Sequence, residues 1–365
     1  MSPKAELPSL SPHVIASSWL DRQLAPALAD FRQRLRRHAI LASSGIAFLS
    51  GIGAFSLSSL ASSNGAWPMP GALNAAILAI VTSVATAAAL FPVLRQRARW
   101  LLRAVSTIAH DNIDLLSVLG KVTELRSGET AGHNLRVTLY TLLFAEALEL
   151  PPDEIIRTVK GALLHDVGKL AVPDCILGRP GKLSPDEQTE MAKHVRYGLE
   201  IIWQSQVLHD AAPVVGTHHE HYDGQGYPLG LKGEAIPQEA RLFALVDVFD
   251  ALTSARAYKP AFGIEEALVT MTAGRGSHFD PALFDRFVEL APGFAGQLPR
   301  DEPALATLLM ERLLPYFELF VLERAMPASS DAGQASGAAP ISQGAAVLRA
   351  AMTALSTPLA VAKKP

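Results

Sequence analysis

The sequence predicts an all-α protein, in which an N-terminal two-helix transmembrane hairpin is followed by an all-helical domain. The first observation is a window, residues 39–94, that contains no Asp, Glu, Lys or Arg. The second is that helix-start signals recur downstream without the polar–apolar alternation that is typical of strands. The third is a series of histidines and carboxylates along this helical region, too many to explain as isolated core residues.

Length and composition limit the possible classes of protein. The 365 residues allow more than one domain, and 49% hydrophobic residues suffice for a substantial core. A net charge of −3 gives no signal for binding a DNA or RNA polymer. The single cysteine, Cys175, excludes an intramolecular disulfide. By composition the chain divides into an N-terminal segment 1–38, a hairpin 39–94, a connecting helix 95–122, a helical domain 123–325 and a low-complexity tail 326–365.

The hairpin is expected to cross a membrane at about residues 39–60 and 72–94. Each segment is close to the ~20 residues that span a bilayer, and the turn-forming residues 64–71 separate them. Arginines gather just before and just after the hairpin, and none lies in the turn. By the positive-inside rule, both ends face the cytoplasm. The alternative is a buried soluble hairpin, because the first segment is rich in Gly and Ser.

After the hairpin, one long helix is expected to leave the membrane. Its apolar residues form a helical stripe: Leu101, Val105, Ile108, Leu115, Leu119 and Val122. Such a stripe can pack on the helical domain or on a second copy of the chain. The sequence leaves both options open, and a homodimer is one of them.

Helix starts within residues 123–325 place the polar residues of interest. The expected helices carry His165 and Asp166 (from a start at Pro152), His194 (from the capping box Ser184-Pro185-Asp186-Glu187), and Asp247 with Asp250 (after Pro237). These helices therefore provide the scaffold that a metal centre needs to hold its ligands.

Eight residues form a candidate metal-binding set: Glu129, His133, His165, Asp166, His194, His218, His219 and Asp247. Glu129 and His133 are four residues apart, which places both on one face of a helix. The set contains no cysteine, which argues against structural zinc. Mixed imidazole and carboxylate ligands suit iron, manganese or another first-row divalent ion. Asp250 either binds a metal or supports a residue that does.

The order of these residues closely resembles the HD-GYP family, a branch of the HD-domain metal-dependent phosphohydrolases. The matching segments are His165-Asp166-Val167-Gly168-Lys169, His218-His219-Glu220, Asp223-Gly224-Gln225-Gly226-Tyr227-Pro228, Asp247-Val248-Phe249-Asp250-Ala251-Leu252-Thr253, Arg256, Tyr258-Lys259-Pro260 and Phe279-Asp280-Pro281. The resemblance covers about residues 120–290. At the ligand positions we find no departure from the family pattern.

The resemblance implies an HD-type catalytic domain in the cytoplasm of a bacterial cell, on a multi-pass anchor in the inner membrane. Its substrate would be cyclic di-GMP, hydrolysed to pGpG, with GMP as a further product left open. The eight residues above would hold two or three divalent ions, most plausibly iron or manganese. His165, Asp166 and Lys169 would be catalytic. Substrate would be bound by Lys169, Tyr227, Arg256 and Lys259.

Two alternatives remain at this point. One keeps the fold as a cyclic di-GMP receptor without turnover, which the complete ligand set disfavours. The other is an HD phosphohydrolase for another cyclic dinucleotide, and the Gly-Tyr-Pro loop disfavours a generic member of that superfamily. What the membrane segment senses cannot be deduced from the residues.

Overall fold

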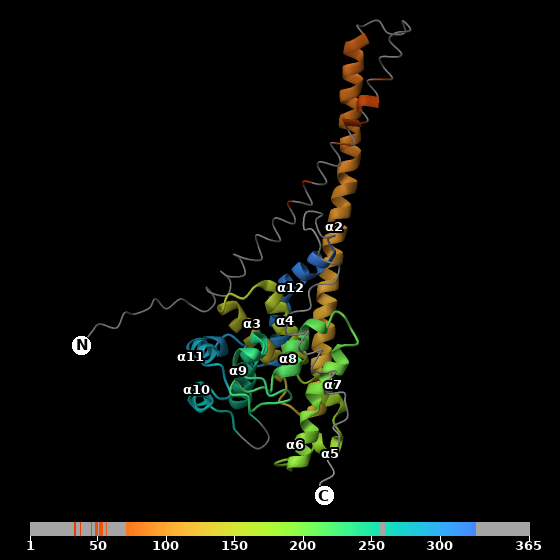
Figure 1. Cartoon of the computed structure of the whole chain (residues 1–365). Coiled ribbons are helices and arrows are strands. Elements are labelled where there is room, and N and C mark those ends of the chain that lie inside the picture. Colours follow the sequence, from red (N-terminus) through yellow and green to blue (C-terminus); the bar gives the residue numbers. More distant parts are fainter. Residues whose placement is uncertain are drawn as a thin grey trace, which may run out of the picture. The chain divides into compact units, whose positions relative to one another are not determined.

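The computed structural model describes residues 71–255 and 260–325, together with isolated positions between Gln33 and Ser56. Within these residues every regular element is a helix, and the one β-bridge joins Arg275 to Phe279 (Figure 1). The prediction of an all-helical domain is therefore confirmed for this part of the chain. Three of the predicted segments lie wholly or largely outside it: residues 1–38, 39–60 and 326–365.

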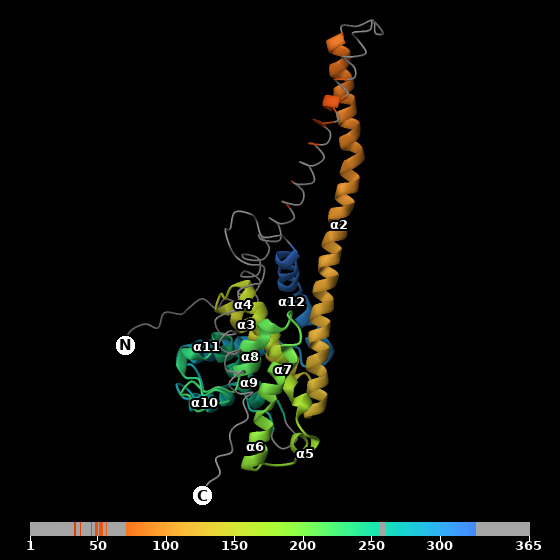
Figure 2. The ribbon, with the colours of Figure 1, turned by 45° about the vertical axis from the view of Figure 1, so that its right-hand side comes forward.

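The first described helix, α2 (Gly71–Ser127), is 57 residues long. It joins the expected second membrane segment and the expected connecting helix into one uninterrupted element (Figure 2). Its most apolar 18-residue window has a mean hydropathy of 2.3 and is not buried in the protein. Among the described residues, α2 is the one helix that is long and apolar enough to cross a membrane.

The other half of the expected hairpin is represented by a few described positions. Gly51 is buried, and a Cβ atom added to it would lie 2.3 Å from Ser83 Oγ and 3.3 Å from the carbonyl oxygen of Ala79 on α2. Only a residue without a side chain permits such a close approach. This contact is of the kind that a helical hairpin requires, since small residues let helices pack closely in membranes.

Beyond α2 the described residues form a bundle of shorter helices, the longest of which is α12 (Glu302–Ala325) with 24 residues. The elements are α3 (His133–Ala147), α4 (Pro152–Leu164), η1 (Val167–Ala171), α5 (Asp174–Leu177), α6 (Pro185–Ala192), α7 (His194–Ile202), η2 (His209–Ala211), α8 (Ala212–Thr217), η3 (Gly233–Ala235), α9 (Gln238–Thr253), α10 (Ile264–Thr272), α11 (Pro281–Ala295) and α12 (Glu302–Ala325).

Local chemistry explains where several of these helices begin. α4 has Pro at its first position and two acidic residues in its first turn, which suits the positive end of a helix dipole. The predicted capping box is present at α6: Glu187 N donates to Ser184 Oγ at 3.4 Å, and Ser184 N donates to Glu187 Oε2 at 2.8 Å. However, α6 ends at Ala192, so His194 opens a new helix rather than continuing this one.

The core lies between α3 and α9, which are buried on most of their sides. Phe144 on α3 and Phe249 on α9 both make edge contacts with Phe287 of α11, at ring-centroid distances of 5.2 and 5.3 Å. Each fully buried side chain of this size contributes about 1.5–3 kcal/mol from its removal from water. This rigid core matters for function because α3 begins at His133 and α9 carries Asp247.

The C-terminal part of α2, from His110 to Ser127, belongs to the same compact unit as this bundle. Ile113 and Leu116 are buried, and Gly120 approaches the carbonyl oxygen of Leu163 so closely that an added Cβ would lie 3.0 Å from it. In contrast, Leu115 and Val122 of the predicted stripe are 64% and 46% exposed. The helical domain therefore covers the opposite face of α2, and most of the predicted stripe is left at the surface.

Candidate metal centre

All eight candidate ligands converge on one site. Seven of them line a cavity of about 770 Å³, and the eighth, His218, lies behind its wall. They come from the loop before α3, from the starts of α3 and α7, from the junction of α4 with η1, from the end of α8, and from α9. Segments more than 100 residues apart in sequence thus supply one cluster.

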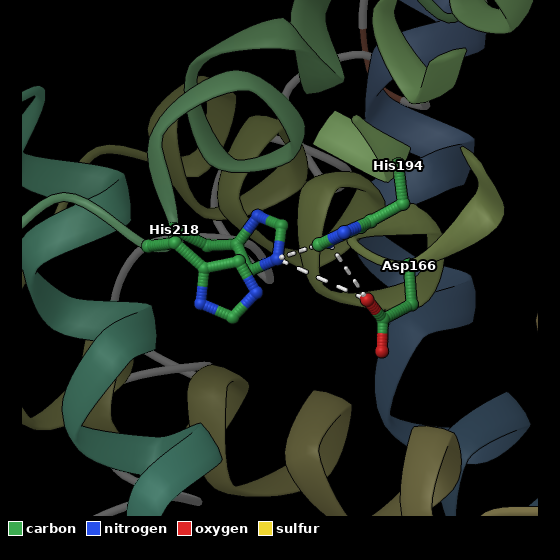
Figure 3. Close-up of side chains that lie close together, drawn as sticks. Asp166, His194 and His218 are labelled. Carbon is green, nitrogen blue, oxygen red and sulfur yellow. Dashed lines mark hydrogen bonds and ion pairs between the residues drawn. The ribbon is translucent and has the colours of Figure 1, made fainter. Parts of the chain in front are cut away.

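The first of two groups contains Asp166, His194, His218 and His219, whose nearest ligand atoms all lie within 4.8 Å of one another. Figure 3 shows His194 and His218 facing the carboxylate of Asp166. The Nε2 atoms of these two imidazoles lie 3.3 and 3.9 Å from Asp166 Oδ1. We call these four residues the proximal group.

The second group, here called the distal group, contains His133, His165 and Asp247, again within 4.8 Å. His133 Nε2 lies 3.6 Å from Asp247 Oδ1. His165 Nε2 lies 3.1 Å from the other carboxylate oxygen of Asp166, Oδ2. Because its two oxygens face different groups, the Asp166 carboxylate is placed to bridge them.

The remaining candidate ligand, Glu129, lies outside both groups and differs from its expected setting. It lies in the loop between α2 and α3 and not on a helix, so the expected helical spacing to His133 was wrong. Its Oε2 atom is nevertheless 3.9 Å from His133 Nε2. The turn at Gly132, with φ of 76°, brings the loop back toward the helix start, a backbone conformation that favours glycine.

The imidazoles are oriented through their other nitrogen. Nδ1 of His165, His194 and His218 lies 2.8, 2.8 and 3.1 Å from backbone carbonyl oxygens three or four residues earlier. A carbonyl can only accept, so each Nδ1 carries a proton, and Nε2 is the nitrogen turned toward the other candidate ligands. His133 achieves the same through a side chain, because its Nδ1 lies 2.8 Å from Asp250 Oδ2.

Several observations fit divalent cations at this site. Glu129 Oε2 and Asp166 Oδ1 are buried, and neither has a hydrogen-bond partner among the described residues. Leaving such oxygens unpaired is costly, and a metal ion removes that cost. Burial and neighbouring imidazoles hold the pKa values of His218 and His219 well below the usual range, so both are neutral, as a metal ligand must be.

Lys169 lies inside the charged cluster. Its Nζ donates to Glu129 Oε1 and to Asp166 Oδ2, both at 2.5 Å. Burial alone would lower the pKa of Lys169, but these carboxylates raise it, so the ammonium keeps its charge. The side chain is 18% exposed and lines the cavity, where a substrate phosphate can reach it.

The Gly-Tyr-Pro loop forms another wall of the cavity. The ring of Tyr227 stacks on the imidazole of His219 at 4.7 Å with an interplanar angle of 27°. The loop is held by Glu220, whose carboxylate accepts from the backbone N–H groups of Leu229 and Leu231 at 2.6 and 3.0 Å. Two other predicted substrate-binding residues, Arg256 and Lys259, lie outside the described residues.

Two residues of the site were not predicted with a role. Glu220 was quoted only as part of a motif, and its function as the anchor of the loop is visible only in three dimensions. Arg136 was missed entirely, although it lies one helical turn after His133. Its guanidinium binds both oxygens of Asp250, at 2.7 and 3.0 Å. This places Asp250 as the partner of a ligand and not in either of the two groups.

A helical bundle with two imidazole–carboxylate groups has the ligand types of a domain that binds divalent metal ions. Residues 117–283 match the HD domain family. The chain is 43% identical over 187 residues to the cyclic di-GMP phosphodiesterase response regulator RpfG of Xanthomonas campestris, covering 51% of this chain and 50% of that protein. A cyclic di-GMP phosphodiesterase of Vibrio cholerae is 42% identical over 191 residues, covering 48% and 39%.

A third relative carries a different substrate in its name. The 3'3'-cGAMP-specific phosphodiesterase 2 of Vibrio cholerae is 41% identical over 178 residues, covering 48% of this chain and 34% of that protein. The chain thus spans between a third and a half of the length of these relatives. These matches confirm the predicted resemblance: residues 117–283 are similar to the HD domain family and to relatives named as cyclic di-GMP phosphodiesterases.

Proposed function

We propose that this chain is a membrane-anchored, metal-dependent phosphodiesterase that hydrolyses cyclic di-GMP to pGpG. The observation that carries the proposal is the pair of imidazole–carboxylate groups on the two sides of Asp166, in a cavity of about 770 Å³. Relatives named as cyclic di-GMP phosphodiesterases support the substrate. The alternative of a receptor without turnover has no specific observation in its favour.

The metals proposed are two or three first-row divalent ions, with iron and manganese as the best fits to mixed imidazole and carboxylate ligands. The ligands proposed are the eight residues of the sequence prediction: Glu129, His133, His165, Asp166, His194, His218, His219 and Asp247. The unpaired Glu129 Oε2 at the edge of the distal group supports a third ion. When bound, such ions act as Lewis acids and activate a water for attack on phosphorus.

The remaining steps fall to side chains of this chain. Lys169 holds an ammonium at the cavity wall, where it would offset the charge of the scissile phosphate. The ring of Tyr227, already stacked on His219, would present its outer side to a guanine base. Arg256 and Lys259 would clamp the second phosphate or base from the rim. His165 and Asp166 would hold the ions in position next to the reacting phosphate.

The nearest competing substrate is 3'3'-cGAMP, because a relative of comparable identity is named for it. The two nucleotides differ in one base, so the same centre can act on both. The test is turnover of the detergent-solubilised chain, loaded with Fe²⁺ or Mn²⁺, on cyclic di-GMP, 3'3'-cGAMP and pGpG. We expect the highest kcat/KM for cyclic di-GMP and pGpG as first product. Absence of hydrolysis of every nucleotide, with metal bound, would contradict an enzyme.

For the anchor we propose two transmembrane helices in the bacterial inner membrane, with the HD-GYP domain in the cytoplasm. The unburied apolar window of α2 and the close approach of Gly51 to Ser83 support a hairpin. Fractionation should recover the chain in the inner membrane. Cysteines in the turn at residues 64–70 should react with a membrane-impermeant reagent added from outside, and a cysteine on α12 should not.

A homodimer is proposed to use the exposed side of α2. Leu115 and Val122 repeat at a heptad interval, and Val118 and Leu125 fill the intermediate positions, at 46–71% exposure. This spacing is that of a coiled-coil seam. Replacing Val118 and Leu125 with Glu should convert a dimer into monomers in analytical ultracentrifugation of the solubilised chain. A mass of one chain for the unchanged protein would contradict the dimer.

A further inference from the structure

We propose that Arg136 and Asp250 are positioning residues that hold His133 as a ligand and thereby control metal occupancy of the distal group selectively. This inference rests on the proposed metal centre and adds to it. Neither residue belongs to the eight candidate ligands. Replacing either residue is expected to weaken metal binding in the distal group only, whereas a general loss of stability would affect both groups.

The imidazoles of the site are oriented in two different ways. His165, His194 and His218 use backbone carbonyls of their own helical turns, which no side-chain substitution removes. His133 depends instead on the carboxylate of Asp250, which comes from a different helix 117 residues away. Among these four imidazoles it is therefore the one whose orientation is set by a replaceable side chain.

Asp250 in turn is fixed by Arg136. The guanidinium spans both carboxylate oxygens, the forked geometry in which an arginine–carboxylate pair is strongest. Asp250 is 1% exposed and His133 is 5% exposed, so water does not replace a lost partner at either one. Removal of the guanidinium would leave a buried carboxylate held by the His133 imidazole alone, an arrangement that allows the carboxylate to rotate.

Arg136 also reaches the loop that carries Glu129. Its Nη1 donates to the carbonyl oxygen of Ala131 at 2.8 Å. The same atom lies close to Gly132, where an added Cβ would be 3.3 Å from it. One guanidinium thus connects α3, α9 and the 128–132 loop around His133. Among the described residues, the hydrogen-bond and ion-pair partners of Arg136 are Asp250 and Ala131, and none is a member of the proximal group.

The expected effect follows from measured behaviour of metal sites in general. Mutation of a group that orients a metal-binding histidine weakens metal affinity by about 10- to 100-fold. For Arg136→Gln we expect this loss in the distal group alone. Arg136→Lys keeps the charge but not the fork and should be intermediate. Asp250→Asn should resemble Arg136→Gln, because an amide cannot accept from both the imidazole and the guanidinium in the same way.

The experiment is Mn²⁺ binding to the full detergent-solubilised chain by chelator competition, with electron paramagnetic resonance of the loaded protein. The unchanged chain should show the coupled spectrum of neighbouring ions. Arg136→Gln, at equal total Mn²⁺, should lose one equivalent and show an isolated ion. The matched control is Arg275→Gln, because Arg275 forms the same forked pair with Asp285 at the surface, far from the ligands in sequence.

The outcomes distinguish a failure of the proposed metal centre from a failure of the proposed positioning role. If the unchanged chain binds no Mn²⁺, the proposed metal centre itself is wrong. If it binds Mn²⁺ but Arg136→Gln and Asp250→Asn keep both stoichiometry and affinity, the positioning role is wrong and the centre stands. Equal loss from both groups in a folded Arg136→Gln also overturns the positioning role. Should that variant fail to fold by circular dichroism, Arg136→Lys decides by the same criteria.

Discussion

The metal centre and the surroundings of Lys160 both bury charged side chains in the same domain. Only around Lys160 does the protein itself supply the partners of the buried charge. Lys160 on α4 is fully buried, and its ammonium has partners on three sides. It donates to Asp210 Oδ2 at 2.9 Å and to the carbonyl oxygen of Val207 at 3.1 Å, and it lies 4.0 Å from the ring centroid of Phe320.

The metal centre has the opposite character. Two carboxylates, Glu129 and Asp166, contact the ammonium of Lys169, and one oxygen of each has no hydrogen-bond partner among the described residues. A buried charge that the protein satisfies by itself serves the fold, as at Lys160. A buried cluster that the protein leaves incomplete requires something from solution. This difference explains why we interpret the metal centre, and not the surroundings of Lys160, as a functional site.

The largest effect should come from removing the bridge between the two groups. Replacing His165 and Asp166 with Ala removes one ligand of the distal group and the carboxylate that faces both groups. We expect hydrolysis of cyclic di-GMP to fall below detection and bound metal to be lost, with the helical circular dichroism largely unchanged. Undiminished turnover in a coupled pGpG assay would reject the assigned centre.

Lys160→Met tests the cluster around Lys160, in which the protein itself satisfies the buried charge. The change leaves Asp210, which is 18% exposed, without its cation. Breaking a buried pair by removing one partner costs about 3–5 kcal/mol, and the partial exposure of Asp210 reduces this to about 2–3 kcal/mol in the free energy of unfolding. Denaturant titration measures it, and metal content should remain that of the unchanged chain.

Chelation is the matching control for that variant. Removing metal should lower Tm of the unchanged chain and of Lys160→Met by similar amounts, because the ions bind the folded state only and do not contact Lys160. The His165-Asp166 double variant should show no shift. A chelator effect that depended on Lys160 would remove the distinction between the two clusters.

The pH dependence of metal affinity sharpens the comparison further. Burial alone would lower the pKa of His165, but the adjacent Asp166 carboxylate outweighs it and raises that pKa to about 9 in the absence of cations. Below pH 9 an ion must therefore displace a proton from His165. Affinity should fall by about tenfold per pH unit for each proton displaced, as pH is lowered from 9 toward 6.

This prediction is checked by isothermal titration of Mn²⁺ in buffers with different ionisation enthalpies. The heat should report proton release at pH 7, and release should vanish above pH 9. Absence of proton release at pH 7 would show that the imidazole is already deprotonated or does not bind the ion.

The smallest effect is expected outside both clusters. Arg256→Ala should mainly weaken substrate binding, since loss of one hydrogen bond to a charged group costs about 1.5 kcal/mol, or roughly tenfold in KM. Metal content and kcat should change little. Steady-state kinetics on cyclic di-GMP decide, and unchanged KM would remove Arg256 from the proposed substrate clamp.

The sequence alone determined the class of the protein. Helix-start signals near Pro152 and Pro237 act over a few residues, so α4 and α9 begin within a residue of their expected positions. The ordered motifs also identified the family, because they record a ligand set directly. Local rules failed where a short helix ended early, at Ala192, and where Glu129 lay in a loop and not on a helix.

Only the tertiary structure decided how the ligands divide and what orients them. Spacing in the chain does not reveal that Asp166 faces both groups, that Asp250 holds His133, or that Arg136 holds Asp250. Apart from the adjacent pair His165 and Asp166, these contacts join residues more than 20, and in two cases more than 110, positions apart. They depend on how α3, α4 and α9 pack, and packing is a property of the whole core that no short segment of sequence encodes.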